Sequence, residues 1–260
     1  MNDPTTLRRL YGRRQGHKLR LGQQALVEEM LPLVSVPEGP LDAQVLFGDD
    51  RPLWLEIGFG AGEHLAWQAD ANPDVGLIGC EPFLNGVVGA LGHAERLELT
   101  NVRLHMGDAL DVLERLPDAS LDRVFLLHPD PWPKARHAKR RFVNPGPLDR
   151  IAAKLKPGGE FRLGTDHPVY GRWALMQMGW RTDFEWLAKT PADWQVPDAQ
   201  GRRAVCVDGS TLAVVSRLLE SGDVRVFVDQ VFALEQAAEA HTALETGHTR
   251  GKVVLKVSDY

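Results

Sequence analysis

The sequence is poor in cysteine. Only two cysteines, Cys80 and Cys206, occur among its 260 residues, and they lie far apart without the spacing of metal ligands. This usage is typical of a reducing compartment and argues against a zinc site or a disulfide framework. We therefore expect a cytoplasmic protein that binds no metal.

Long hydrophobic runs are also missing. No apolar run approaches the roughly 20 residues that a membrane-spanning helix needs, and the N-terminus lacks the apolar core of a signal peptide. A hydrophobic content of 43% nevertheless suffices for a sizeable core. The composition therefore predicts a globular protein with no membrane partner.

The chain has no overall excess of positive charge, because its formal net charge is -5. Cations are instead concentrated in two segments. Residues 1–22 contain six lysines and arginines against a single acid, Asp3, and residues 134–141 contain five. Local basic runs of this kind either contact nucleic acid or form a solvated surface, and composition alone leaves both readings open.

The pattern divides the chain into three segments. Residues 1–34 form a basic arm followed by a short helix from Gln23 to Leu31, which Pro32 is expected to end. Residues 35–194 form the main domain, which begins with a proline-rich linker that holds one short strand at 45–47. Residues 195–260 form a tail of different character.

Strand-like and helix-like segments alternate along the main domain. Strands are predicted at 53–57, 75–80, 102–105, 121–127 and 160–163, and helices after residue 62, over 85–99, over 109–116 and near 147–155. Strands separated by helices form parallel βαβ units, so we expect an α/β fold with a doubly wound, mostly parallel sheet.

An acid stands at the end of each of these five strands. The acids are Glu56, Glu81, Asp108, Asp130 and Asp166. A single acid after a strand is an ordinary turn residue, but ligands of such sheets bind across the carboxyl ends of the strands. Acids at five successive strand ends therefore predict an acidic binding rim.

A glycine-rich turn follows the first strand. Gly58, Gly60 and Gly62 would let the backbone approach a ligand closely. Glu63 stands where the dinucleotide motif Gly-x-Gly-x-x-Gly needs its third glycine, and its charge would repel a pyrophosphate at a helix N-terminus. A cofactor with a cationic centre and no phosphate fits this turn better.

S-adenosylmethionine has these properties, since it carries a sulfonium and a ribose with two free hydroxyls. Glu81, at the end of the second strand, is placed to accept both ribose hydroxyls. Asp108, after the third strand, is placed near the adenine amino group. The turn and these two acids together predict S-adenosylmethionine as the cofactor.

The segment from His128 to Arg141 combines a carboxylate, three prolines, an indole and the second basic run. Asp130 would face the reacting groups, and the cations would bind phosphates. Trp132 would either stack on a base or pack beneath the proline-rich loop.

These motifs together resemble those of the bacterial tRNA (guanine-N7-)-methyltransferases. The resemblance covers about residues 8–194 and lies in Leu55-Glu56-Ile57-Gly58-Phe59-Gly60-x-Gly62-Glu63, in Glu81, in Asp108, in Pro129-Asp130-Pro131-Trp132-Pro133-Lys134-x-Arg136-His137-x-Lys139-Arg140-Arg141 and in Gly164-Thr165-Asp166. It implies a class I, Rossmann-like methyltransferase fold, S-adenosylmethionine as methyl donor, and N7 of the guanine at position 46 of the tRNA variable loop as acceptor.

Carried over residue by residue, the resemblance implies three groups of site residues. The cofactor would be bound by the glycine turn and by Glu56, Glu81, Asp108 and Asp130, of which Asp130 would also be catalytic. The substrate would be contacted by Lys134 and Asp166. RNA would be contacted by Arg136, His137, Lys139, Arg140 and Arg141.

The tail departs from this family. Thr182-Asp183-Phe184-Glu185 matches a Thr-x-x-Glu pattern with which the family holds its guanine, but it comes too soon after Asp166. Residues 228–241 and 247–255 instead resemble the C-terminal end of zinc-independent medium-chain quinone oxidoreductases, without their nucleotide-binding region. An alternative function therefore stays open: a cofactor- and tRNA-binding protein with impaired or no catalysis.

Overall fold

The structure is a computed structural model that describes residues 16–179, 181–185, 228–233 and 252–256. The chain divides into two units, Met1–Val207 and Asp208–Tyr260. In the second unit, β6 (Val228–Ala233) pairs in parallel with β7 (Lys252–Lys256). The basic arm before residue 16, the expected domain boundary at 194–195 and most of the oxidoreductase-like segments lie outside the described residues.

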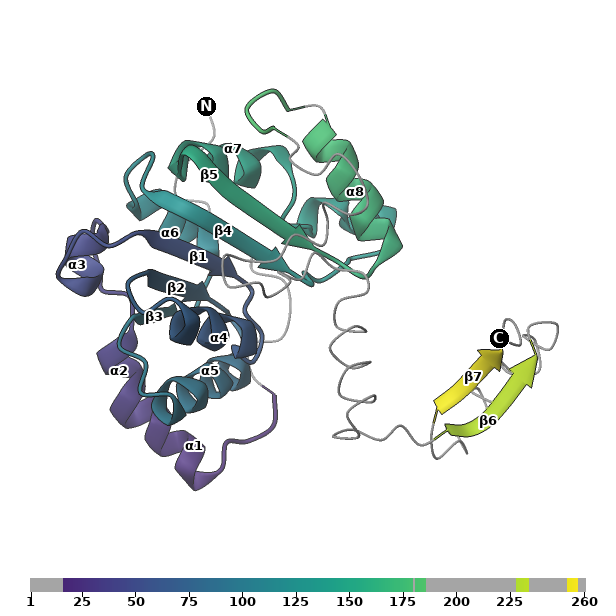
Figure 1. Ribbon diagram of the computed structural model, residues 1–260, viewed down its shortest axis with the longest axis horizontal. Helices are drawn as coiled ribbons and strands as arrows, with labels where there is room; N and C mark the ends of the chain where they lie inside the picture. The colour runs from purple at the N-terminus through teal and green to yellow at the C-terminus, as the bar shows by residue number, and fades with distance from the viewer. Residues whose placement is uncertain (1–15, 180, 186–227, 234–251, 257–260) are drawn as a thin grey trace. The chain divides into compact units, whose positions relative to one another are not determined.

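The first unit contains a five-stranded parallel sheet in the order β3-β2-β1-β4-β5 (Figure 1). Its strands are β1 (Leu53–Ile57), β2 (Gly76–Cys80), β3 (Val102–His105), β4 (Leu121–Leu127) and β5 (Leu155–Gly164). The doubly wound parallel sheet predicted from the sequence is confirmed. Strand order reverses between β1 and β4, and at such a switch point a crevice opens at the carboxyl ends of the strands.

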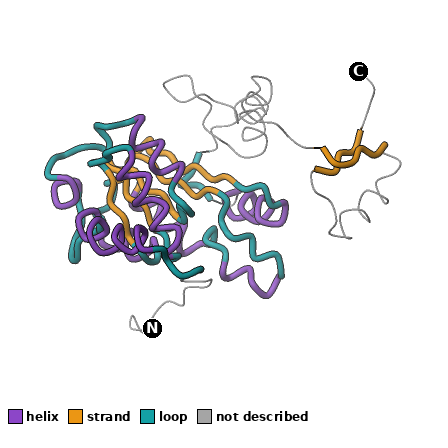
Figure 2. Tube along the Cα trace, turned by 90° about the horizontal axis from the view of Figure 1, so that it is seen from below, coloured by secondary structure: helices purple, strands orange, loops and turns teal. Residues whose placement is uncertain are grey.

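Helices cover both faces of this sheet (Figure 2). One face packs against α4 (Glu63–Ala71) and α5 (Leu84–Arg96), and the other against α6 (Ala109–Arg115), α7 (Pro145–Lys154) and α8 (Pro168–Gly179). Successive strand residues point to opposite faces, so Leu77 belongs to the first core and Ile78 to the second. Among the described residues, no helix is long and apolar enough to cross a membrane.

The N-terminal helical segment runs past the proline that was expected to end it. It consists of α1 (Leu21–Ala25), a π-helical turn (Leu26–Met30) and α2 (Leu31–Val34). The prediction was wrong because Pro32 lies in the first turn of α2, where a backbone N–H has no partner within its helix and its absence costs nothing. Leu26, Met30 and Leu31 pack against the core formed with α4 and α5.

The short strand expected at 45–47 is instead a helix, α3 (Ala43–Phe47). The Asp42 carboxylate accepts the Val45 N–H at 2.7 Å and caps its N-terminus. Gly48, in the left-handed conformation with φ of 83°, ends it. Capping at both ends therefore decides the structure of this segment over its apolar, strand-like composition.

Strand β5 begins earlier than the expected Glu160. The pairing with β4 passes from Leu155, opposite Leu121, to Glu160, opposite Arg123. Residues 156–159 form an irregularity inside the strand, and Gly158 adopts a φ of 80° there. Pro157 and Gly158, residue types that are common in turns, therefore interrupt the strand and do not precede it.

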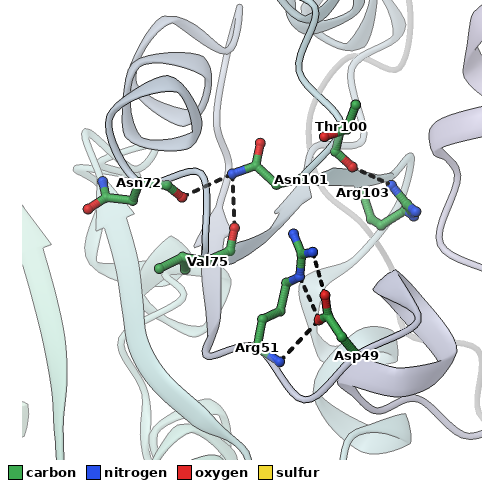
Figure 3. Close-up of polar contacts among 7 residues, drawn as sticks. All are labelled: Asp49, Arg51, Asn72, Val75, Thr100, Asn101 and Arg103. Atoms are coloured by element: carbon green, nitrogen blue, oxygen red, sulfur yellow. Dashed lines mark hydrogen bonds and ion pairs between the residues drawn. The ribbon is translucent and has the colours of Figure 1, made fainter.

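The amino-terminal edge of the sheet holds polar clusters that join loops to strands (Figure 3). Asn101 is 3% exposed, and its amide nitrogen donates to the carbonyls of Ala69, Asn72 and Val75 at 3.0, 3.1 and 2.9 Å. Asp49 accepts from the Arg51 guanidinium at 2.7 and 2.6 Å. These contacts fix the loops opposite the acidic rim.

Candidate active site

The carboxyl ends of the strands bring the predicted acids to one edge of the sheet. Glu81 follows β2, Asp108 follows β3 and Asp130 lies in the loop after β4. The pKa of Glu81 is raised by burial, and the charge of Asp130 raises it further. Burial also raises the pKa of the Cys80 thiol, to which the charges of Asp108 and Glu81 contribute. The acids are thus near enough to interact.

The glycine turn after β1 has the backbone geometry that its sequence predicts. Gly58, Gly60 and Gly62 all adopt left-handed conformations, with φ of 70°, 60° and 87°. A Cβ on Gly58 or Gly60 would meet no atom within 4 Å, so both residues border open space. A ligand can therefore approach the turn backbone directly, which no side chain at these positions would allow.

Helix α5 lies directly against this turn. A Cβ on Gly86 would collide with the Gly60 carbonyl oxygen, and a Cβ on Gly89 would meet the Ala61 carbonyl oxygen at 2.7 Å. A Cβ on Gly62 would in turn meet Ala90 of α5 at 2.6 Å. Sequence reasoning missed the roles of Gly86 and Gly89; the signal was their spacing of three residues on one side of a helix.

Glu81 ties the glycine turn to the start of α5. One carboxylate oxygen accepts the Gly60 N–H at 3.0 Å, and the other accepts the Phe83 N–H at 3.0 Å. These bonds offset part of the rise in pKa that burial causes. Each oxygen of a carboxylate can accept two hydrogen bonds, so both remain able to accept a ligand hydroxyl.

Glu56 is the most buried acid of the rim. Its side chain is 3% exposed, and its carboxylate lies 2.8 Å from His64 Nδ1. His64 Nε2 is 3.1 Å from the Gln68 amide nitrogen, which can only donate. This assigns the His64 proton to Nδ1, so His64 donates to Glu56. The cofactor contact predicted for Glu56 stays a prediction.

Asp108 is half-buried and caps α6. Its carboxylate accepts the Leu110 N–H at 3.0 Å, which fixes the side chain at the end of β3. The opposite end of the rim is formed by Asp166, an exposed residue after β5. Its carboxylate lies 3.8 Å from His128 Nδ1, and the His128 N–H donates to the Gly164 carbonyl at 2.8 Å. The ends of β4 and β5 are thereby held together.

The loop that carries Asp130 has an unusual backbone. Asp130 itself is exposed, whereas His128 and Trp132 on either side of it adopt positive φ of 49° and 41°. Such conformations are uncommon for residues other than glycine, and surrounding contacts usually maintain them. The loop is therefore held in one particular shape.

The basic segment after this loop forms a 3₁₀ helix, Ala135–Arg140. Lys134, Arg136 and Lys139 are exposed, as phosphate contacts would require. The Arg140 guanidinium lies over the Trp132 ring, 4.8 Å from its centroid. The pKa of His137 is lowered by desolvation and by the nearby cations Arg140, Arg136 and Lys134, which favours its neutral form at neutral pH.

Arg141 differs from the other cations of this segment because it is only 5% exposed. Its guanidinium donates to the carbonyls of Pro131 at 3.2 Å and Trp132 at 3.0 Å. It also lies over the Trp173 ring of α8, 4.8 Å from the centroid. This burial argues against the predicted role of Arg141 as an RNA contact.

The segment Thr182–Glu185 takes part in packing and ion pairing. Phe184 contacts Phe161 of β5 with ring centroids 6.1 Å apart, and Arg181 pairs with Asp183 and with Asp149 of α7. These partners raise the pKa of Arg181.

Within the described ranges, no group of His, Cys, Asp and Glu side chains could hold a metal ion.

Known proteins resemble this chain over most of the region that forms the site. The family described as "Putative methyltransferase" matches residues 50–204. The tRNA (guanine-N(7)-)-methyltransferase of Zymomonas mobilis subsp. mobilis is 64% identical over 195 residues, which are 75% of this chain and 84% of that protein. The enzyme of the same name from Novosphingobium aromaticivorans is 62% identical over 201 residues, with the same coverage of 75% and 84%.

Solved structures are more distant. The structure of the 16S rRNA methyltransferase KamB is 19% identical in sequence, with a TM-score of 0.40. The match covers 55% of this chain and 74% of KamB. A likeness of this degree supports no argument about function.

Proposed function

The chain belongs to the putative methyltransferase family, together with the tRNA (guanine-N(7)-)-methyltransferases, and from this membership we propose how its acidic rim works. The protein is an enzyme that transfers a methyl group from S-adenosylmethionine to N7 of a guanine in tRNA. The observation that carries the proposal is the position of Glu81, which joins the glycine turn to α5 and interacts with Asp130.

The residues of the rim fit the cofactor. S-adenosylmethionine supplies a methyl group made electrophilic by a cationic sulfonium. The open space beside Gly58 and Gly60 leaves room for a ligand against the turn backbone, which Gly62 completes. Glu81 accepts hydrogen bonds from the two ribose hydroxyls with its remaining lone pairs. Asp108 accepts a hydrogen bond from the adenine amino group. Glu56, held by His64, adds negative charge that favours a cationic ligand.

Asp130 acts on charge and not as a base. Guanine N7 has a free lone pair and no proton to lose, so the reaction needs alignment more than a general base. The methylated ring is cationic, and a carboxylate fixed beside it stabilises the charge as it develops. Asp130 suits this role because it is exposed in the loop after β4, near enough for its charge to act on Glu81.

The substrate would lie across Asp130, between the basic segment and the end of β5. Lys134 and Asp166 contact the guanine nucleotide in this proposal. Arg136, His137, Lys139 and Arg140 follow on the 3₁₀ helix and contact the tRNA backbone. Contacts of cations with phosphates release counterions, so tRNA affinity would fall steeply as the salt concentration rises. We place the reaction in the cytoplasm, where tRNA is processed.

The alternative, a cofactor- and tRNA-binding protein with impaired catalysis, rests on the tail. Four relatives at 60–64% identity carry an enzyme name, which weighs against it. The residues proposed to act on the cofactor and on the guanine all fall between residues 50 and 204, the region that matches the family.

Two unmodified tRNA transcripts test the proposal and refine the acceptor to position 46. They differ only at that position, guanine in one and adenine in the other. With S-adenosylmethionine labelled in its methyl group, we expect label in the guanine transcript only, and strand cleavage specific for 7-methylguanosine should occur at position 46. Binding of both ligands without transfer to either transcript would support the non-catalytic alternative and overturn the proposal.

A further inference from the structure

The first step concerns the shape of the loop that carries Asp130. His128 and Trp132 both adopt left-handed backbone conformations on either side of the carboxylate. Such conformations are unfavourable for side chains of this size, so contacts from outside the loop must maintain them. The His128 N–H, bonded to the Gly164 carbonyl, holds the first end of the loop. The second end needs a corresponding anchor.

Arg141 provides this anchor. Its Nε donates to the Pro131 carbonyl at 3.2 Å and its Nη2 to the Trp132 carbonyl at 3.0 Å, two consecutive carbonyls directly after Asp130. Only the planar fork of a guanidinium presents two donors with this fixed spacing. Because Arg141 is 5% exposed, water competes little for these bonds.

Helix α8 in turn fixes Arg141. The Trp173 ring lies 4.8 Å from the guanidinium, and its Nε1–H donates to the Val143 carbonyl at 2.6 Å. The hydroxyl of Tyr170, which is fully buried, accepts the Val143 N–H at 3.3 Å. Asn144 closes the turn by donating to the Ala138 carbonyl at 3.1 Å. A continuous series of contacts therefore joins α8 to the Asp130 loop.

We propose that Arg141 is a positioning residue that holds Asp130 in place for methyl transfer, and not an RNA contact. The catalytic part of this inference rests on the proposed function; the structural part does not. The basic run thus contains cations with two roles: Lys139 is exposed and available to phosphates, whereas Arg141 is buried beneath the loop. Loss of Arg141 should therefore lower the rate of transfer and leave tRNA affinity unchanged.

The test compares Arg141→Gln with Lys139→Gln, which removes one charge from the same segment. For each variant we would measure the single-turnover rate at saturating cofactor and tRNA, the tRNA affinity at several salt concentrations, and amide hydrogen exchange in residues 128–134. The amides of this range are those of His128, Asp130, Trp132 and Lys134, because its three prolines have none. Exchange of residues 53–57 in β1 and the thermal midpoint report on the fold as a whole. Arg141→Lys, which keeps the charge and can still donate to one carbonyl, serves if Arg141→Gln does not fold.

We expect Arg141→Gln to slow transfer by about 10- to 100-fold, because small displacements of a catalytic group have effects of this size. Its residues 128–134 should exchange faster, while β1, tRNA affinity and the salt dependence stay as in the unaltered protein. Lys139→Gln should do the opposite: weaker tRNA binding and a salt slope lower by about 1, with normal exchange of the loop.

Two results would overturn the inference. One is unchanged exchange of residues 128–134 in Arg141→Gln; the other is a loss of tRNA affinity and salt dependence like that of Lys139→Gln. If the unaltered protein transfers no methyl group at all, the proposed function fails, and the exchange measurements still decide whether Arg141 holds the loop.

Discussion

Burial raises the pKa of Glu81 and the charge of Asp130 raises it further, although the two acids follow different strands and β1 lies between those strands in the sheet. The glycine turn after β1 therefore lies between two carboxylates, one from β2 and one from β4. The Asp130 charge disfavours the ionised form of Glu81, and a cation bound between the two carboxylates would offset that repulsion. If the cofactor binds here as proposed, this arrangement favours a sulfonium over a pyrophosphate.

The raised pKa of Glu81 predicts that cofactor affinity depends on pH. In the proposed function the ionised Glu81 carboxylate accepts hydrogen bonds from the ribose hydroxyls, and protonation reduces its capacity to accept them. Burial moves the pKa upward from 4.5, so the dissociation constant for S-adenosylmethionine should begin to rise at a higher pH than for an ordinary glutamate. Calorimetric titrations from neutral pH downward measure this. Glu81→Gln should bind weakly at every pH; an affinity of the unaltered protein that stays constant down to pH values near 4.5 would refute the assignment.

The contact between α5 and the glycine turn predicts a sharp difference between two substitutions in one helix. Gly86→Ala places a Cβ against the Gly60 carbonyl oxygen, so α5 must move away from the turn. Overpacking of this kind costs about 1–3 kcal/mol, and cofactor affinity should fall as well. Gly92→Ala is the matched control, since its Cβ would meet only a Leu26 methyl carbon at 3.9 Å.

Because alanine is the better helix former, Gly92→Ala should raise the free energy of unfolding by up to about 1 kcal/mol. Urea denaturation and cofactor titration measure both effects. Equal behaviour of the two variants would show that α5 does not depend on close approach to the turn.

The hydrogen bonds of Asn101, at the opposite edge of the sheet from the rim, should contribute to the free energy of unfolding. The Asn101 amide nitrogen donates to three carbonyls, so Asn101→Ala leaves buried acceptors without a donor. This should lower the free energy of unfolding by about 1–3 kcal/mol. Asn101→Asp should cost more, because it turns a carboxylate towards those same carbonyls, of which Figure 3 shows those of Asn72 and Val75. The exposed neighbour Thr100 is the control: Thr100→Ala should change the unfolding free energy by less than about 0.5 kcal/mol. A urea midpoint of Asn101→Asp above that of Asn101→Ala would contradict this account.

Local signals in the sequence predicted much of the fold. Strands β1, β3 and β4 occupy the predicted residues because their apolar residues, which alternate with polar ones in β3, are bounded by turn residues. The segment 43–47 was mispredicted because its apolar residues are compatible with a strand, and only the caps Asp42 and Gly48 favour the helix. Those caps were visible in the sequence, so this error was avoidable.

The contacts between elements that are distant in the chain could not be predicted from the sequence. Lys139 and Arg141 look equivalent in a basic run, and what separates them is Trp173, which comes from a helix later in the chain. Gly86 and Gly89 acquire their importance only where α5 meets the backbone of the turn. The acids of the rim were predictable as a set because parallel strands end at the same edge, but the bonds of Glu81 to Gly60 and Phe83 were not.

The most direct test of the account is the single-turnover rate of Asp130→Asn with labelled S-adenosylmethionine and unmodified tRNA, both at saturating concentration. Asparagine keeps the size of the side chain and removes its charge. We predict a rate at saturating cofactor lower by about 10²-fold or more, the usual effect of losing one electrostatic contact to a transition state, with tRNA affinity changed only slightly. A variant that methylates guanine N7 at the rate of the unaltered protein would contradict the central claim that the Asp130 charge stabilises the transition state.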